Sequence, residues 1–151
     1  MRFLVLAVGR QKPGPLQELE RAYLKRVTLP ITIREVEERR KLSPAELKAR
    51  EAELLLAALP KGAVIVALDG RGETLSSTAF ARRLALWREA GDDLAFVIGG
   101  AEGLAETILQ RARFTLSLGT MTWPHLLVRG MLLEQIYRAQ QILAGHPYHR
   151  E

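Results

Sequence analysis

The sequence predicts one α/β domain over residues 1–151, with a mainly parallel open sheet and helices on both faces. Apolar segments of strand length alternate along the chain with segments whose apolar residues recur at helical spacing, which is typical of parallel α/β sheets. Two strand segments, residues 63–68 and 94–98, are apolar at every position, as expected of strands that helices cover on both faces. The sequence contains no internal repeat and no linker, so we interpret it as a single domain.

Five strands are expected, each a short apolar run that ends near glycine, proline or a charged residue. They cover residues 3–8, 31–36, 63–68, 94–98 and 114–118. Five helices are expected at about residues 15–27, 43–59, 77–90, 103–113 and 126–144. Ser43, and Ser76 or Ser77, have the hydroxyl side chains that cap a helix at its start. The glycine-rich segment 69–72 is expected to form a loop after the third strand.

The stretch from Phe114 into the last helix is the one around which the chain is organised. Gly119 and Thr120 break the strand pattern, Thr122 is a candidate N-cap, and Pro124 suits the first helical turn. The first two turns are apolar nearly all round, at Leu126, Leu127, Val128, Met131, Leu132 and Leu133. A helix of this kind needs a partner besides its own sheet, so we expect a homodimer.

Composition excludes several classes of protein. The chain has no cysteine, which rules out a disulfide framework and thiolate metal sites. Its apolar start is too short for a membrane-spanning helix and lacks a signal-peptide pattern, so we expect a cytoplasmic protein with no membrane contact. The net charge of +5 and pI near 10.0 favour an anionic partner such as nucleic acid.

Three glycine-containing turns follow Leu68, Ile98 and Leu118. Since parallel strands end at one edge of a sheet, the three turns are expected to meet there and form a small-molecule site. The alternative is that these glycines serve only the turns. The segment 99–103 is not a G-x-G-x-x-G fingerprint and follows a late strand, so a Rossmann cofactor site is not expected.

Several motifs carry a family resemblance. They are Ile-Gly-Gly-Ala-Glu-Gly at 98–103, Leu-Ser-Leu-Gly-Thr-Met-Thr-Trp-Pro-His at 116–125, Leu-Val-Arg at 127–129, Glu-Gln-Ile-Tyr-Arg-Ala at 134–139 and His-Pro-Tyr-His-Arg-Glu at 146–151. Together they resemble the large-subunit ribosomal RNA pseudouridine-N3 methyltransferases of the SPOUT class, over essentially the full length. The chain departs from this family at Gly119-Thr120, at Trp123, where leucine or phenylalanine is frequent, and in a shortened region 37–48.

The resemblance implies a SPOUT-type fold with a C-terminal trefoil knot, a homodimer, and S-adenosylmethionine as methyl donor without a metal. It implies methylation of N3 of a pseudouridine (position 1915, in the loop of helix 69) in 23S ribosomal RNA within the ribosome, and no DNA partner. Carried over by position, the cofactor-binding residues are Leu68, Gly100, Leu118, Gly119, Thr120, Met121, Thr122 and Trp123. Gly100→Val is expected to place a side chain where the backbone must approach the ligand.

All three histidines lie near the carboxyl end of the chain. His125 can serve a structural hydrogen bond or catalysis, and His146 lies at a natural helix stop. His149 and Tyr148 belong to a terminal segment without a core pattern, so we expect them on the substrate side, with His149 taking the N3 proton and Tyr148 stacking on the base. Arg150 would contact phosphate. His146 and His149 have no evident partner set for a metal site.

Two arginines interrupt the apolar last helix. Arg129 and Arg138 are expected either to pair with a carboxylate such as Glu134 or to contact a partner chain or phosphate. We include Arg129 with Tyr148 and His149 among the candidate catalytic residues.

Three functions remain open from sequence. The leading hypothesis is a methyltransferase acting on ribosomal RNA. The second is a ribosome-binding factor without activity, which would not bind S-adenosylmethionine. The third is a nucleotide-binding enzyme that uses the glycine turns for phosphate and would bind ATP or NAD.

Overall fold

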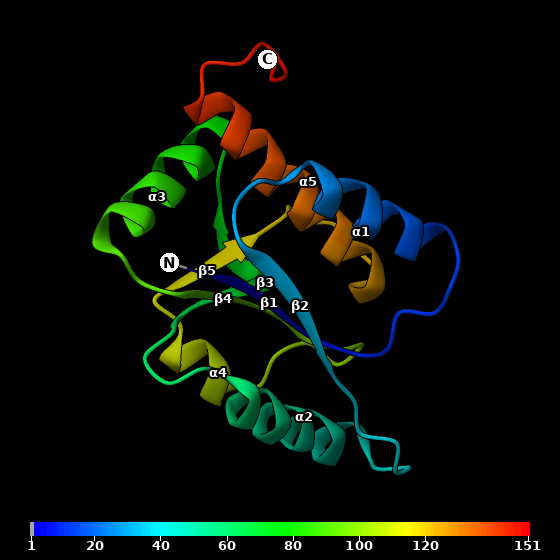
Figure 1. The fold of residues 1–151 in the computed structure, drawn as a ribbon. Coiled ribbons are helices and arrows are strands. Elements are labelled where there is room, and N and C mark those ends of the chain that lie inside the picture. The colour runs from blue at the N-terminus through cyan, green and yellow to red at the C-terminus, as the bar shows by residue number, and fades with distance from the viewer. Residues whose placement is uncertain (1) are drawn as a thin grey trace.

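The computed structural model describes residues 2–151, in which strands and helices alternate strictly (Figure 1). The strands are β1 (Phe3–Val8), β2 (Ile31–Val36), β3 (Val64–Thr74), β4 (Leu94–Ile98) and β5 (Phe114–Ser117). The helices are α1 (Pro15–Arg26), α2 (Pro44–Ala58), α3 (Ser77–Ala90), α4 (Glu106–Arg111) and α5 (His125–Leu143). The predicted α/β class is confirmed.

The strands form one sheet in the order β2-β1-β4-β3-β5, and each pair of neighbours is parallel. In register, Phe3 of β1 lies beside Ile31 and Leu94, and Val64 of β3 lies on the other side of Leu94. The carboxyl ends of β4, β3 and β5 are therefore neighbours. This order brings together the three turns that the sequence singles out.

Helices cover both faces of the sheet, α1, α3 and α5 on one side and α2 and α4 on the other (Figure 1). Side chains alternate between the two layers along each strand, so Val5 packs toward the first group and Leu4 and Leu6 toward the second. Each fully buried aliphatic or aromatic side chain contributes roughly 1.5–3 kcal/mol. No described helix combines the length and hydrophobicity needed to cross a membrane.

The glycine-rich segment 69–72 is part of β3, so the predicted loop is wrong. β3 pairs with Leu116 of β5 twice, first through Leu68 and again through Glu73, so the residues between them bulge out of the ladder. A Cβ at Gly72 would lie 2.4 Å from the Thr115 carbonyl oxygen. Glycine therefore permits the two strands to stay in contact, a non-local requirement that the local pattern does not reveal.

The helix starts agree only in part with expectation. Ser43 and Ser76 are confirmed as N-caps: their hydroxyls accept hydrogen bonds from the backbone N–H groups three residues later, at 3.2 and 3.1 Å. Thr122 is not the cap of α5. Pro124 occupies that position, and its carbonyl accepts from the N–H groups of Leu127 and Val128. The predicted helix 103–113 is shorter, because a turn at Gly103 (φ 77°) precedes α4.

Candidate active site

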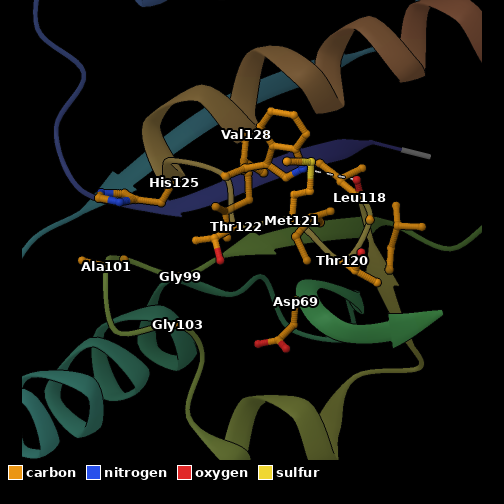
Figure 2. Close-up of a pocket in the computed structure, with 17 residues that line it drawn as sticks. Asp69, Gly99, Ala101, Gly103, Leu118, Thr120, Met121, Thr122, His125 and Val128 are labelled. Carbon is orange, nitrogen blue, oxygen red and sulfur yellow. Dashed lines mark hydrogen bonds between the residues drawn. The ribbon is translucent and has the colours of Figure 1, made fainter. Parts of the chain in front are cut away.

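A cavity of about 270 Å³ opens at the carboxyl ends of β3, β4 and β5 (Figure 2). All eight cofactor-binding candidates line it, namely Leu68, Gly100, Leu118, Gly119, Thr120, Met121, Thr122 and Trp123. The wall is completed by residues that the sequence analysis did not assign, namely Asp69, Gly70, Ile98, Gly99, Ala101, Gly103, Leu116, His125 and Val128. The predicted convergence of the three strand ends is confirmed.

Most unassigned residues are sequence neighbours of assigned ones, so extending each motif by one or two positions would have found them. Asp69 follows Leu68, and His125 lies two residues after Trp123. Figure 2 shows Asp69 on one side of the cavity and Val128 and His125 on the other. The Arg71 backbone and guanidinium both donate to Asp69, and these hydrogen bonds outweigh its burial and lower its pKa. Asp69 is therefore ionised at neutral pH and ion-paired with Arg71.

The glycines of the cavity differ in what surrounds them. A Cβ at Gly70, Gly103 or Gly119 would meet nothing within 4 Å, so their backbone leaves open space for a ligand. Gly119 has a φ of 117°, a backbone conformation that residues with a side chain rarely adopt. Gly100 behaves differently from expectation: its Cβ would point into the protein, 3.0 Å from both Glu51 Oε2 and a Val8 methyl. Gly100→Val would therefore disturb the packing beneath the turn.

Glu51 on α2 lies beneath that turn and is only 7% exposed. Its Oε1 has no hydrogen-bond partner among the described residues. Burial, and to a lesser degree the charge of Glu102, raise its pKa. The pKa of this carboxyl is therefore higher in the folded than in the unfolded protein. As the pH rises from the unfolded-state pKa to the folded-state pKa and beyond, the group lowers the free energy of unfolding.

We expect Glu51→Met to increase the free energy of unfolding at pH 8 by on the order of 1 kcal/mol, because it removes a buried group that must otherwise ionise without a partner. The gain should shrink at pH 4.5, where the parent carboxyl stays protonated in the folded state. Urea unfolding at the two pH values measures it, with exposed Glu53→Met on the same helix as control. An equal gain at both pH values would contradict this account.

The loop 118–123 is closed by its own hydrogen bonds. Trp123 Nε1 donates to the Leu118 carbonyl at 3.3 Å, and the Gly119 N–H donates to Ser117 Oγ at 3.2 Å. Met121 is 74% exposed, so this loop presents apolar surface beside the cavity. The two hydrogen bonds reduce the number of conformations open to the loop before any ligand binds.

His125 begins α5 and lines the cavity. A Cβ at Gly9 would lie 3.3 Å from its Nε2, so the imidazole packs against the end of β1. Burial, and then the charge of Arg129, lower the pKa of His125. The ring is therefore neutral at neutral pH and offers one donor and one acceptor.

Arg129 is fully buried, one helical turn after His125. Its guanidinium pairs with Glu35 of β2, donates to the Gly9 carbonyl at 2.9 Å, and lies 3.9 Å from Glu20 of α1. Burial is the largest single influence on the pKa of Glu35 and would raise it, but the hydrogen bonds from Arg129 and the Gln11 backbone, together with the positive charge of Arg129, lower that pKa overall. Arg129 thus joins α5, α1 and two strands, and in this conformation it presents no charge to a phosphate.

The C-terminal tail folds back on the end of α5. Tyr148 donates to Glu134 at 3.0 Å, and its ring packs edge-on against Tyr137 at 4.8 Å. Burial, followed by the hydrogen bond to Glu134, raises the pKa of Tyr148 to about 12, so the phenol stays protonated. His146 Nδ1 accepts from the Tyr148 N–H, which is a structural role. His149 contacts Arg138 at 3.1 Å.

The cavity lies at the start of α5, and the tail docks on the helix from its middle onward. His125 at the start of α5 lines the cavity, whereas Tyr148 and His149 contact Glu134 and Arg138, in the middle and second half of the helix, and the C-terminus lies beyond its far end (Figure 1). Glu134 lies nine residues after His125, which is ~14 Å along the helix axis. The structure therefore brings together the eight predicted cofactor residues but leaves Tyr148, His149 and Arg129 outside the cavity of the same chain. No group of metal-ligating side chains occurs among residues 2–151.

A family model described as "Predicted SPOUT methyltransferase" matches residues 1–149. This chain belongs to the SPOUT methyltransferase family. Curated relatives of this SPOUT protein are named "Ribosomal RNA large subunit methyltransferase H". One from Rhodospirillum centenum is 60% identical over 99% of both chains, and one from Paracoccus denitrificans is 48% identical over the whole of both. The resemblance stated from the sequence is confirmed.

Solved structures share the SPOUT fold at low identity. A probable methylase family protein from Haemophilus influenzae has a TM-score of 0.60 and 9% identity, covering 99% of this chain and 70% of that one. The SpoU methyltransferase AviRb from Streptomyces viridochromogenes has a TM-score of 0.51 and 15% identity, covering 96% and 61%. AviRb has also been solved in complex with the cofactor AdoMet. The trefoil knot implied by the family stays a prediction for this chain.

Proposed function

We propose that this protein transfers a methyl group from S-adenosylmethionine to N3 of a pseudouridine in 23S ribosomal RNA. The observation that carries the proposal is the full-length match at 60% identity to a ribosomal RNA large subunit methyltransferase H, combined with a cavity lined by all eight predicted cofactor residues. Net charge of +5 suits an RNA substrate. An enzyme acting on ribosomes would work in the cytoplasm.

The cavity fits the methyl donor in chemistry. Open backbone at Gly70, Gly103 and Gly119 can hydrogen-bond the adenine and ribose, and Leu118 and Met121 can cover the ring. When bound, S-adenosylmethionine supplies an activated methyl group, so that N3 loses its proton and gains the methyl while the electrons of the broken S–C bond stay on sulfur. The protein's part is to hold the base in line, an effect worth up to roughly 7–11 kcal/mol.

We propose that the active form is a homodimer built on α5. Leu126, Leu127, Val128 and Met131 at its start are only half-buried in the single chain. An apolar hollow of about 540 Å³ adjoins this helix, lined among others by Leu19 and Met131, and it shares Leu118 and Gly119 with the cofactor cavity. A second copy would cover this surface. A well-folded monomer in sedimentation at micromolar concentration would contradict the proposal.

The tail supports a site shared between two chains. Tyr148 and His149 dock from the middle of α5 onward and do not line the cavity of their own chain, so we assign them to the substrate side of the partner's cavity. An antiparallel pairing of the two α5 helices would place each tail beside the other chain's loop 118–123. The role of Arg129 is then to hold the start of α5 and the His125 ring against the cavity.

Methyl incorporation into ribosomes tests the function. Ribosomes that contain the target pseudouridine should accept labelled methyl groups, whereas ribosomes from cells unable to make that pseudouridine should not. Free 23S RNA and assembled ribosomes are compared as substrates, and we expect the ribosomes to be methylated in preference. Calorimetry separates the alternatives: a binding factor without activity would not bind S-adenosylmethionine, and a nucleotide-binding enzyme would bind ATP or NAD.

We expect Trp123→Phe to weaken S-adenosylmethionine binding by about 2–10-fold, the scale of one hydrogen bond. The ring is kept, so the loss reports the bond from the indole N–H to the Leu118 carbonyl. Calorimetry measures the affinity, and Trp123→Leu should weaken it further because it also removes the ring. Unchanged affinity in Trp123→Phe would show that this bond does not order the loop.

A further inference from the structure

Four side chains form one hydrogen-bonded cluster where the C-terminal tail docks on the second half of α5. Glu134 Oε1 accepts from Arg138 Nε at 3.0 Å, from Arg138 Nη2 at 2.6 Å and from the Tyr148 hydroxyl at 3.0 Å. Glu134 and Arg138 are one helical turn apart, and both are largely buried. With two of its nitrogens held by one carboxylate oxygen, Arg138 has its orientation fixed. Its Nη1 is directed at His149.

This contact determines the tautomer of the neutral imidazole. Arg138 Nη1 lies 3.1 Å from His149 Nδ1. A guanidinium has donors only and does not lose its proton in proteins, so Nδ1 must be the acceptor. A neutral imidazole has one N–H, and it is therefore on Nε2.

The Nε2–H of His149 has no hydrogen-bond partner among residues 2–151. The atom is buried without a hydrogen bond. Glu151 Oε1 lies 3.9 Å from this atom, too far to accept a hydrogen bond from it, and belongs to a side chain that is 83% exposed. Glu151 Oε1 is held instead by the Thr78 hydroxyl at 3.2 Å. A covered N–H without an acceptor is costly, and an exposed terminal side chain is easily displaced by a better acceptor.

We propose that Glu134 and Arg138 are positioning residues that fix His149 as its Nε2–H tautomer, and that His149 donates to a carbonyl oxygen beside N3 of the substrate base. This rests on the proposed function, which it deepens. An imide nitrogen such as N3 is flanked by two carbonyls, and negative charge moves onto their oxygens when N3 loses its proton. A fixed N–H donor there stabilises the charge as it develops. The N3 proton then leaves to water, because the imidazole lone pair at Nδ1 is already used by Arg138.

The tautomer is measurable in the protein without substrate. Nitrogen-15 NMR at neutral pH should show His149 protonated at Nε2 and unprotonated at Nδ1, with His125→Gln and His146→Gln variants used to assign its signals. Arg138→Lys keeps a donor-only cation and should keep the tautomer, whereas Arg138→Leu should give a mixture. Dominant Nδ1–H in the parent, or a spectrum unchanged by Arg138→Leu, would overturn the role of Arg138.

Activity separates a donor from a base. Glutamine can place an N–H near the position of Nε2 but cannot take a proton at neutral pH. We expect His149→Gln to keep methyl transfer within ~10-fold of the parent, while His149→Ala loses ~10²-fold, the scale of a lost oxyanion donor. Equal loss in both variants would overturn the donor role. If the parent methylates no ribosome, the proposed function fails, while the NMR result still decides whether Arg138 fixes the tautomer.

Discussion

A chain that lacks residues 148–151 is expected to lose methyl transfer by at least ~10²-fold while still binding S-adenosylmethionine. The truncation removes Tyr148 and His149, which we place on the substrate side, and leaves every residue that lines the cofactor cavity. Donor affinity from calorimetry and methyl incorporation into ribosomes are the two measurements. Because Tyr148 packs on Tyr137, some stability is lost too, and His149→Ala provides the milder variant.

A mixed dimer tests whether the tail acts on the partner. One chain carries the truncation, and the other carries Gly119→Val, which puts a side chain at a left-handed position on the cavity wall. Each homodimer should be inactive. The heterodimer, purified through two different tags, has one intact cavity facing one intact tail and should recover about half the parent activity if sites are shared across a symmetric interface. An inactive heterodimer would place the tail in the site of its own chain or outside it.

Arg129→Leu is expected to lower the free energy of unfolding by about 3–5 kcal/mol, the usual cost of removing one partner from a buried ion pair. The change leaves the Glu35 carboxylate, buried Glu20 and the Gly9 carbonyl without their common donor. It also frees the start of α5, so S-adenosylmethionine binding should weaken with it.

Urea unfolding of Arg129→Leu measures this loss. The matched control is Arg82→Leu on the exposed face of α3, which should change the free energy of unfolding little. Adding Glu20→Leu to Arg129→Leu should recover part of the stability, because it removes one of the stranded carboxyls. A cost below about 1 kcal/mol for Arg129→Leu, similar to that of a surface arginine, would mean that the buried cluster contributes little to the fold.

The sequence by itself determined most of the strands and helices and the edge of the sheet at which the cavity opens. Continuous apolar runs such as 94–98 can be satisfied only between two layers of helices, and parallel strands place their following turns at one edge. Local sequence was sufficient for these features, because the spacing of apolar residues and the positions of proline and glycine set the backbone conformation within a few residues. The motif resemblance added the family and, with it, the eight residues from Leu68 to Trp123 that line the cavity.

Only the tertiary structure decided the partners of the charged side chains. Arg129 pairs with Glu35, 94 positions away, and Gly72 is required by the Thr115 carbonyl of another strand. His149 is directed by Arg138, and Gly100 faces Glu51 where the sequence suggested a ligand. Such contacts depend on how distant segments meet. A charged side chain has several possible partners along the sequence. The packing of helices on the sheet decides which of them comes within reach.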